Sequence, residues 1–192
     1  MERIKQYIMS VKFEESVMNE MESILSNFLS GHDVKLTVPV DVFRVASTLG
    51  FDVRGSEFRD KLEGLIIVNE AVKKIDGFNS NKIIAYDCTQ DINAKKFIVG
   101  HELAHYIEKK HGSPDAKIVL AARDRQTFYS DNVEEQRKDY ISAALLIPKE
   151  DLLSRYPKES VMDSDDFYNE VAEAYNVNVK LAERRVKEVY NI

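Results

Sequence analysis

Hydrophobic residues in the first part of the chain recur every three or four positions, which is the period of an amphipathic helix. In the segment 12–30 these positions are Val17, Met18, Met21, Ile24, Leu25, Phe28 and Leu29. Gly31 follows them as a helix stop. A shorter helix is expected from Pro39, a residue tolerated at the first helical position, to Gly50. The pattern therefore predicts two helices before residue 51.

The hydrophobic period changes after residue 50. Three short runs, FDVRGSEF, LEGLIIV and KIIAYD, are rich in β-branched and aromatic residues, which favour strands. Turn-forming residues punctuate these runs, among them Gly55 and Gly64. Short runs that follow one another with turns between them predict a small antiparallel meander.

Helical spacing returns in the second half of the chain. Asp91 is suited to cap a long helix over 92–110, because its carboxylate can accept the first free backbone N–H groups. A further helix is expected over 133–147, where Pro148 ends it. One or two final helices are expected over 166–190. The second half is therefore predicted to be mainly helical.

The stretch 113–132 has no clear period and permits a helix over 116–124. No repeat, low-complexity tract or Pro/Gly-rich linker divides the chain, so we expect a single domain over residues 1–192. Together the elements predict an α+β fold, which is mainly helical and contains a small antiparallel sheet.

Composition and charge narrow the possible functions. Of the 192 residues, 44% are hydrophobic and 31% are charged, with a formal net charge of -6. An acidic chain lacks the broad basic surface that attracts nucleic acid or an anionic membrane. The N-terminal segment has no apolar signal-peptide core, and no run approaches the roughly 20 apolar residues of a membrane span. We therefore expect a cytoplasmic protein that contacts neither nucleic acid nor membrane directly.

Two other features have ordinary structural interpretations. Cys88 is the single cysteine, so it cannot form a disulfide within the chain, and we expect a small buried hydrophobic residue. The C-terminal cations Lys180, Arg184, Arg185 and Lys187 alternate with glutamates. This pattern is typical of a solvated helix face rather than a nucleic-acid interface.

The sequence HELAH provides the candidate chemistry. Two of the four histidines, His101 and His105, stand four residues apart within the long predicted helix. Residues at this spacing share one helical face, so both imidazoles can reach one metal ion. Glu102 lies beside them and can act as a general base. This is the His-Glu-x-x-His pattern of zinc hydrolases. The alternative is a pair of histidines that only form hydrogen bonds at a helix surface.

A catalytic zinc ion usually has three protein ligands and one open position. His111 stands ten residues after His101, but Glu108 occupies the place of a glycine that would turn the chain, so the helix would carry His111 away. Glu135 in the next predicted helix is the better candidate. Asp139, one turn later, could accept the second ring N–H of a ligand histidine. The alternative for this acidic pair is two solvated helix charges.

Two segments carry a resemblance to a known family. The run KIIAYDCTQDINAKKFIVGHELAHYIEKK, followed downstream by VEEQRKDYISAALLIP, resembles the ImmA/IrrE family of zinc metallo-endopeptidases. In that family one helix reads R-F-x-x-A-H-E-L-G-H and a later one reads E-x-x-A-N-x-F-A-x-x-L-L-M-P. The resemblance covers residues 37–150 and places Glu135 on the family's glutamate ligand. Gly100, Ala104, Lys138 and Ile141 depart from the family pattern.

The resemblance implies a zincin-like active-site helix. It implies that His101, His105 and Glu135 bind Zn²⁺, that Glu102 is the catalytic base, and that Asp139 supports a ligand histidine. It also implies a protein substrate, a helix-turn-helix repressor whose cleavage releases transcription. An exposed edge strand could hold the substrate by strand addition. The competing hypothesis is a regulatory protein that binds a metal and such a repressor without cutting it, and the presence of Glu102 favours the enzyme.

The sequence does not single out a donor for the oxyanion that forms during amide hydrolysis. Tyr106, Tyr129, Tyr140 and Arg123 are candidates. Each has an ordinary alternative as a packing tyrosine or a surface arginine, so the pattern leaves this role open.

Overall fold

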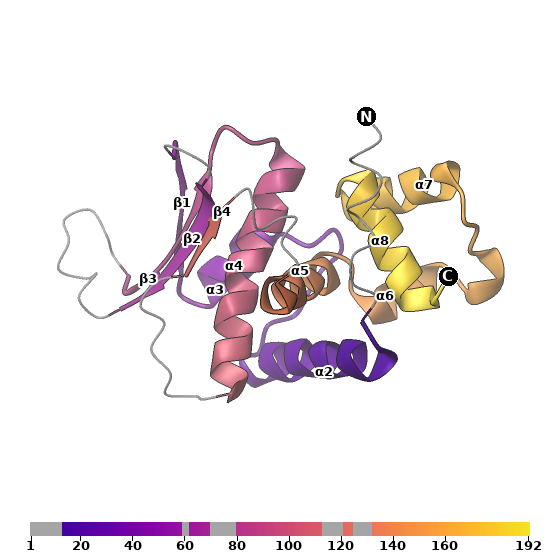
Figure 1. Cartoon of the computed structure of the whole chain (residues 1–192), viewed down its shortest axis with the longest axis horizontal. Coiled ribbons are helices and arrows are strands. Elements are labelled where there is room, and N and C mark those ends of the chain that lie inside the picture. Colours follow the sequence, from indigo (N-terminus) through magenta and orange to yellow (C-terminus); the bar gives the residue numbers. More distant parts are fainter. Residues whose placement is uncertain (1–12, 59–61, 70–79, 113–120, 125–131) are drawn as a thin grey trace.

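The computed structural model describes residues 13–58, 62–69, 80–112, 121–124 and 132–192. Within these residues the helices are α2 (Glu15–Gly31), α3 (Val42–Thr48), α4 (Ile92–Gly112), α5 (Val133–Leu146), α6 (Lys149–Arg155), α7 (Asp165–Tyr175) and α8 (Val179–Tyr190), with a short 3-10 helix, η3 (Lys158–Ser160). The strands are β1 (Asp52–Ser56), β2 (Leu62–Val68), β3 (Lys82–Asp87) and β4 (Ala121–Asp124). The predicted α+β class, mainly helical with a small sheet, is confirmed (Figure 1).

Aspartate side chains cap the starts of α3 and α4. The Asp91 carboxylate accepts hydrogen bonds from two backbone N–H groups of α4, at 2.9 and 3.0 Å, so the predicted cap is confirmed. Helix α3 begins later than expected. Its cap is Asp41, whose carboxylate accepts a hydrogen bond from the Arg44 N–H at 3.1 Å, while Pro39 precedes the helix. A side-chain acceptor, rather than the fixed proline backbone, therefore determines where α3 starts.

The sheet is mixed, which corrects the expected antiparallel meander. The strand order is β1-β3-β2-β4, and β3 pairs parallel with β1 and antiparallel with β2. Strand β3 occupies an inner position because it is strongly apolar, with Ile83, Ile84 and Ala85 buried. Strand β1 is at an edge, where Arg54 forms an ion pair with Asp52 at 2.6 Å. Hydrophobicity, rather than order along the chain, decides which strands lie inside the sheet.

The ambiguous stretch contains a strand. Residues Ala121–Asp124 form β4, which pairs antiparallel with β2, so a helix over 116–124 is wrong for these positions. Residues 113–120 lie outside the described residues. Pairing with β2 is a tertiary interaction that the local pattern does not encode.

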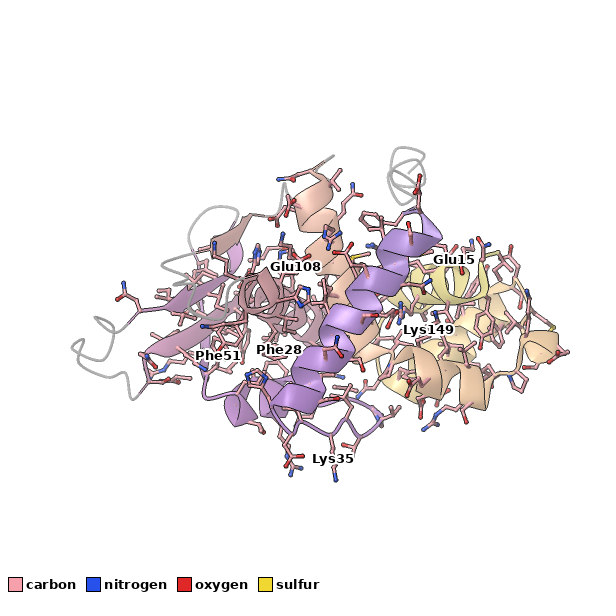
Figure 2. All side chains as sticks on the ribbon, turned by 90° about the horizontal axis from the view of Figure 1, so that it is seen from below. Glu15, Phe28, Lys35, Phe51, Glu108 and Lys149 are labelled. Carbon is pink, nitrogen blue, oxygen red and sulfur yellow. The ribbon has the colours of Figure 1, made fainter. Side chains whose placement is uncertain are left out.

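Helix α4 is the central element of the fold. It packs on β2 and β3 and on α5, and α2 lies across both α4 and α5 (Figure 2). Helices α7 and α8 pack on each other, and α8 reaches α5 (Figure 1). Hydrophobic residues from α2 to α8 form one buried cluster. In the described part of the chain, no helix is long and apolar enough to cross a membrane.

Cys88 is exposed, which corrects the expectation of a buried residue. It lies in the turn after β3, where the preceding residue points inward instead. The Asp87 carboxylate is buried and accepts hydrogen bonds from the backbone N–H and the hydroxyl of Thr89, at 2.9 and 2.6 Å. This turn leaves the cysteine on the outer side.

The C-terminal cations do not all lie on a solvated face. Arg185 is fully buried, with 0% of its surface exposed. Its guanidinium donates to Glu22 of α2 at 2.5 Å and to the Ile147 carbonyl at 3.0 Å, and it lies 5.2 Å from the Tyr140 ring centroid. The expectation is therefore wrong at Arg185, because this residue joins α8 to α2 and α5.

Replacing Arg185 by methionine is expected to lower the free energy of unfolding by about 3 kcal/mol, because Glu22 then loses its charged partner in a low-dielectric setting. Chemical denaturation measures this loss. The control is Lys187→Met on the same helix, where the side chain is 38% exposed and the expected change stays within about 0.5 kcal/mol. Equal effects of the two substitutions would contradict a joining role for Arg185.

Candidate metal centre

Helix α4 holds the HELAH segment in the interior of the molecule. His101 is 1% exposed and Glu102 is 0% exposed, while the His105 side chain is 16% exposed. Their helix is anchored on both sides of the segment by buried residues, which are Phe97, Ile98, Val99, Tyr106 and Ile107. The two imidazole rings lie 5.0 Å apart between centroids. The motif is therefore fixed by the core rather than displayed on a free surface.

Helix α5 brings two carboxylates to the histidines. Glu135 Oε2 lies 3.2 Å from His101 Nε2, and Glu135 Oε1 lies 3.9 Å from His105 Nε2. The other nitrogen of His101, Nδ1, donates a hydrogen bond to Asp139 Oδ1 at 2.7 Å. Glu135 and Asp139 are one helical turn apart, so both reach α4 from the same face of α5. The structure thus brings together all four of these residues from two helices.

The three ligand-type side chains suit a metal ion. Nitrogen or oxygen atoms of His101, His105 and Glu135 all lie within 4.8 Å of one another. Two tetrahedral ligands of zinc, each 2.0–2.2 Å from the ion, are about 3.3 Å apart. The 3.2 Å between Glu135 Oε2 and His101 Nε2 is close to this separation. Two imidazoles and a carboxylate at these distances could hold a divalent metal ion.

Neighbouring side chains shift the pKa values of two residues on α5, Glu135 and Lys138. The hydrogen bond with His101 lowers the pKa of Glu135, although burial acts in the opposite direction. Lys138 is 8% exposed, and its ammonium lies 3.0 Å from both Glu108 and Glu134. Desolvation lowers the pKa of Lys138, but the hydrogen bonds and charges of these glutamates outweigh it and raise the pKa overall. The lysine that departs from the family pattern is therefore accommodated as a paired cation.

A cavity of about 570 Å³ lies beside His105. Its lining residues come from α2, α4 and α5, and they are Glu20, His105, Glu108, Lys109, Val133, Glu134, Arg137 and Lys138. Arg137 connects the three helices, because it contacts Glu108 at 2.8 Å and Glu20 at 3.3 Å. Paired charges therefore line the pocket next to His105.

Glu102 lies against the sheet, on a different side of α4 from Glu135. A Cβ atom added to Gly64 of β2 would be 2.9 Å from Glu102 Oε1 and 2.5 Å from Ile98 Cγ2. Gly64 is buried inside β2 and Gly55 lies inside β1, so the expectation that these two glycines mark turns is wrong. A glycine inside a strand pattern often marks such a close approach, and this signal could have identified the position. Gly64 therefore makes room for the candidate base.

Other candidates lie away from this cluster. His111 is exposed in the last turn of α4, as the missing glycine at position 108 predicts. The Tyr106 hydroxyl accepts a hydrogen bond from Lys82 at 2.9 Å, and the Tyr140 hydroxyl donates to Glu22 at 2.9 Å. These two tyrosines have the ordinary packing roles. Tyr129 and the Arg123 side chain lie outside what the structure describes.

An arrangement of two histidines four residues apart on one helix, with a carboxylate from a second helix, is typical of metal-dependent hydrolases. A family model, Peptidase_M78, described as the IrrE N-terminal-like domain, matches residues 62–187. The chain therefore belongs to this family of metallopeptidases. The match starts and ends later along the chain than the resemblance over 37–150. A comparison with curated proteins gives no match.

Replacing Gly64 by alanine is expected to lower the free energy of unfolding by about 1–3 kcal/mol, because the added methyl group must displace Ile98 or Glu102 from a packed interior. Urea denaturation measures the change. The matched control is Gly31→Ala in the last turn of α2, where nothing lies within 4 Å of an added Cβ. A Gly64 variant no less stable than the wild type would contradict the close approach.

Proposed function

We propose that the protein is a zinc-dependent endopeptidase. The observation that carries this proposal is the cluster of His101, His105 and Glu135, whose ligand atoms lie within 4.8 Å of one another. Membership of a metallopeptidase family supports the hydrolytic class. The choice of zinc rests on the donor set, since two histidines and one glutamate with an open fourth position are a known catalytic zinc site.

Different residues would bind the metal ion and transfer the proton. When bound, Zn²⁺ would polarise the scissile carbonyl and lower the pKa of a water molecule. Glu102 accepts a proton from the attacking water and later donates it to the nitrogen of the leaving amine. Asp139 accepts the Nδ1–H of His101 and so fixes the tautomer and the orientation of that ring. Glu135 would supply the carboxylate ligand, since its two oxygens lie 3.2 Å from His101 Nε2 and 3.9 Å from His105 Nε2.

The proposed substrate is a cytoplasmic helix-turn-helix repressor, which the protein cuts to release transcription. Support comes from the resemblance of the two motif-bearing segments to the ImmA/IrrE family. The net charge of -6 also favours an effect on transcription through a protein rather than through DNA. Strand β4 is an edge of the described sheet and pairs with β2, which carries Gly64 beside Glu102. An extended segment of the substrate could add to this edge.

The ligand assignment predicts the zinc content of variants. We expect the wild type to retain about one zinc ion per chain after dialysis, and the double variant His105→Ala/Glu135→Ala to retain almost none, because one imidazole cannot hold the ion. Metal analysis of purified protein measures both. His111→Ala is the control and keeps its zinc, since His111 lies outside the cluster. Equal zinc content in the double variant and the wild type would overturn the assignment.

The role of Glu102 predicts the outcome of a cleavage assay. Zinc-loaded protein is mixed with a purified helix-turn-helix repressor, and the intact repressor is followed by electrophoresis. Glu102→Gln is expected to lower the cleavage rate by at least about 10²-fold while zinc content stays unchanged, because the amide cannot accept the proton. If the wild type and the variant both bind the repressor and leave it equally intact, the non-proteolytic regulatory alternative is favoured.

A further inference from the structure

Helices α4 and α5 pack closely against each other at a glycine and a serine. A Cβ atom added to Gly100 would lie 2.4 Å from Ser142 Oγ, and 3.4 Å from Ser142 Cβ. Ser142 is 0% exposed, and its hydroxyl donates a hydrogen bond to the Phe97 carbonyl of α4 at 3.0 Å. The serine hydroxyl therefore occupies the space that a side chain at position 100 would need.

This contact lies directly beside the candidate metal centre. Gly100 precedes His101, and Ser142 follows Asp139 by one helical turn on the same face of α5. The 2.7 Å contact of His101 with Asp139 and the 3.2 Å contact of His101 with Glu135 both cross the same helix interface. A change in helix spacing at Gly100 therefore changes the distance between the histidines of α4 and the carboxylates of α5.

The serine hydroxyl cannot simply turn aside if the space is filled. It is fully buried, so rotation would exchange its hydrogen bond to the Phe97 carbonyl for another position in a packed interior. The alternative response is separation of the two helices. Either response disturbs the interface, and helix separation pulls Glu135 and Asp139 away from His101.

We propose that Gly100 and Ser142 are a matched pair of positioning residues, which set the spacing of α4 and α5 at the value that metal binding requires. This inference rests on the proposed metal site and adds residues that neither bind the ion nor react. Ligand sets need placement within about 0.5 Å, so a small shift of one helix is sufficient to weaken binding.

The proposal predicts that Gly100→Ala changes Tm in opposite directions in two backgrounds. Alanine is a better helix former than glycine. Without a steric conflict at position 100, Gly100→Ala would therefore stabilise α4. In the wild-type background we expect the opposite, a lower Tm of the zinc-free protein and about tenfold weaker zinc binding. In the Ser142→Ala background, where the hydroxyl is absent, the same substitution is expected to raise Tm and leave zinc binding within about threefold.

The experiment measures zinc affinity by competition with a chelator, and Tm without zinc, for four proteins: the wild type, Gly100→Ala, Ser142→Ala and Gly100→Ala/Ser142→Ala. Gly112→Ala in the last turn of α4 is the control, because nothing lies within 4 Å of its added Cβ. Rescue of zinc affinity in the double variant supports the pair. A double variant as weak as Gly100→Ala, or one that fails to fold, overturns it.

Two further results separate this inference from neighbouring explanations. If Gly100→Ala lowers Tm but binds zinc as tightly as the wild type, the contact is structural only and the positioning role is wrong. Zinc affinity is measured without any peptide, so failure to cut a repressor overturns the proposed function and leaves this test intact. A wild type that binds no zinc overturns the metal site and the inference together.

Discussion

The crossing of α4 and α5 is the constraint on which the rest of the structure depends. His101 is almost completely buried, and both of its ring nitrogens face carboxylates of α5, at 2.7 and 3.2 Å. Buried polar groups are costly unless they are hydrogen-bonded, so each helix supplies the partners that the other needs. Neither helix contains the site alone. The cluster of His101, His105 and Glu135 exists only at this separation of the two helices.

Helices α2 and α8 hold α5 in position. Burial raises the pKa of Tyr140, so its phenol stays protonated and donates to Glu22 of α2 at 2.9 Å. Arg185 of α8 donates to the same glutamate. Tyr140 follows Asp139 in the chain, so this buried network of three helices fixes the segment that faces His101. Buried ionic networks can be retained because they specify one arrangement, and here that arrangement determines where the carboxylates lie.

Local patterns predicted most of the elements and the residues of the cluster, but they missed β4 and α6 and did not predict how elements meet. The spacing of His101 and His105 is visible because four residues are one turn of a helix, and Glu135 and Asp139 follow from the same period. The strand order, Gly64 inside β2 and the burial of Arg185 were missed. Each of these depends on a partner distant in sequence. The sequence around Arg185 is the same whether its guanidinium contacts solvent or Glu22, so the pattern could not predict its burial.

Helix α4 separates two chemical tasks by the direction of its side chains. Successive residues of an α-helix point about 100° apart, so His101 faces α5 while Glu102 faces β2. The distance between ligands is therefore controlled by helix packing, whereas the space around the candidate base is controlled by Gly64 in the sheet. Because different neighbours control them, substitutions can change the distance between ligands and the space around the candidate base independently. The small sheet thus contributes directly to the site, although it supplies none of the candidate ligands.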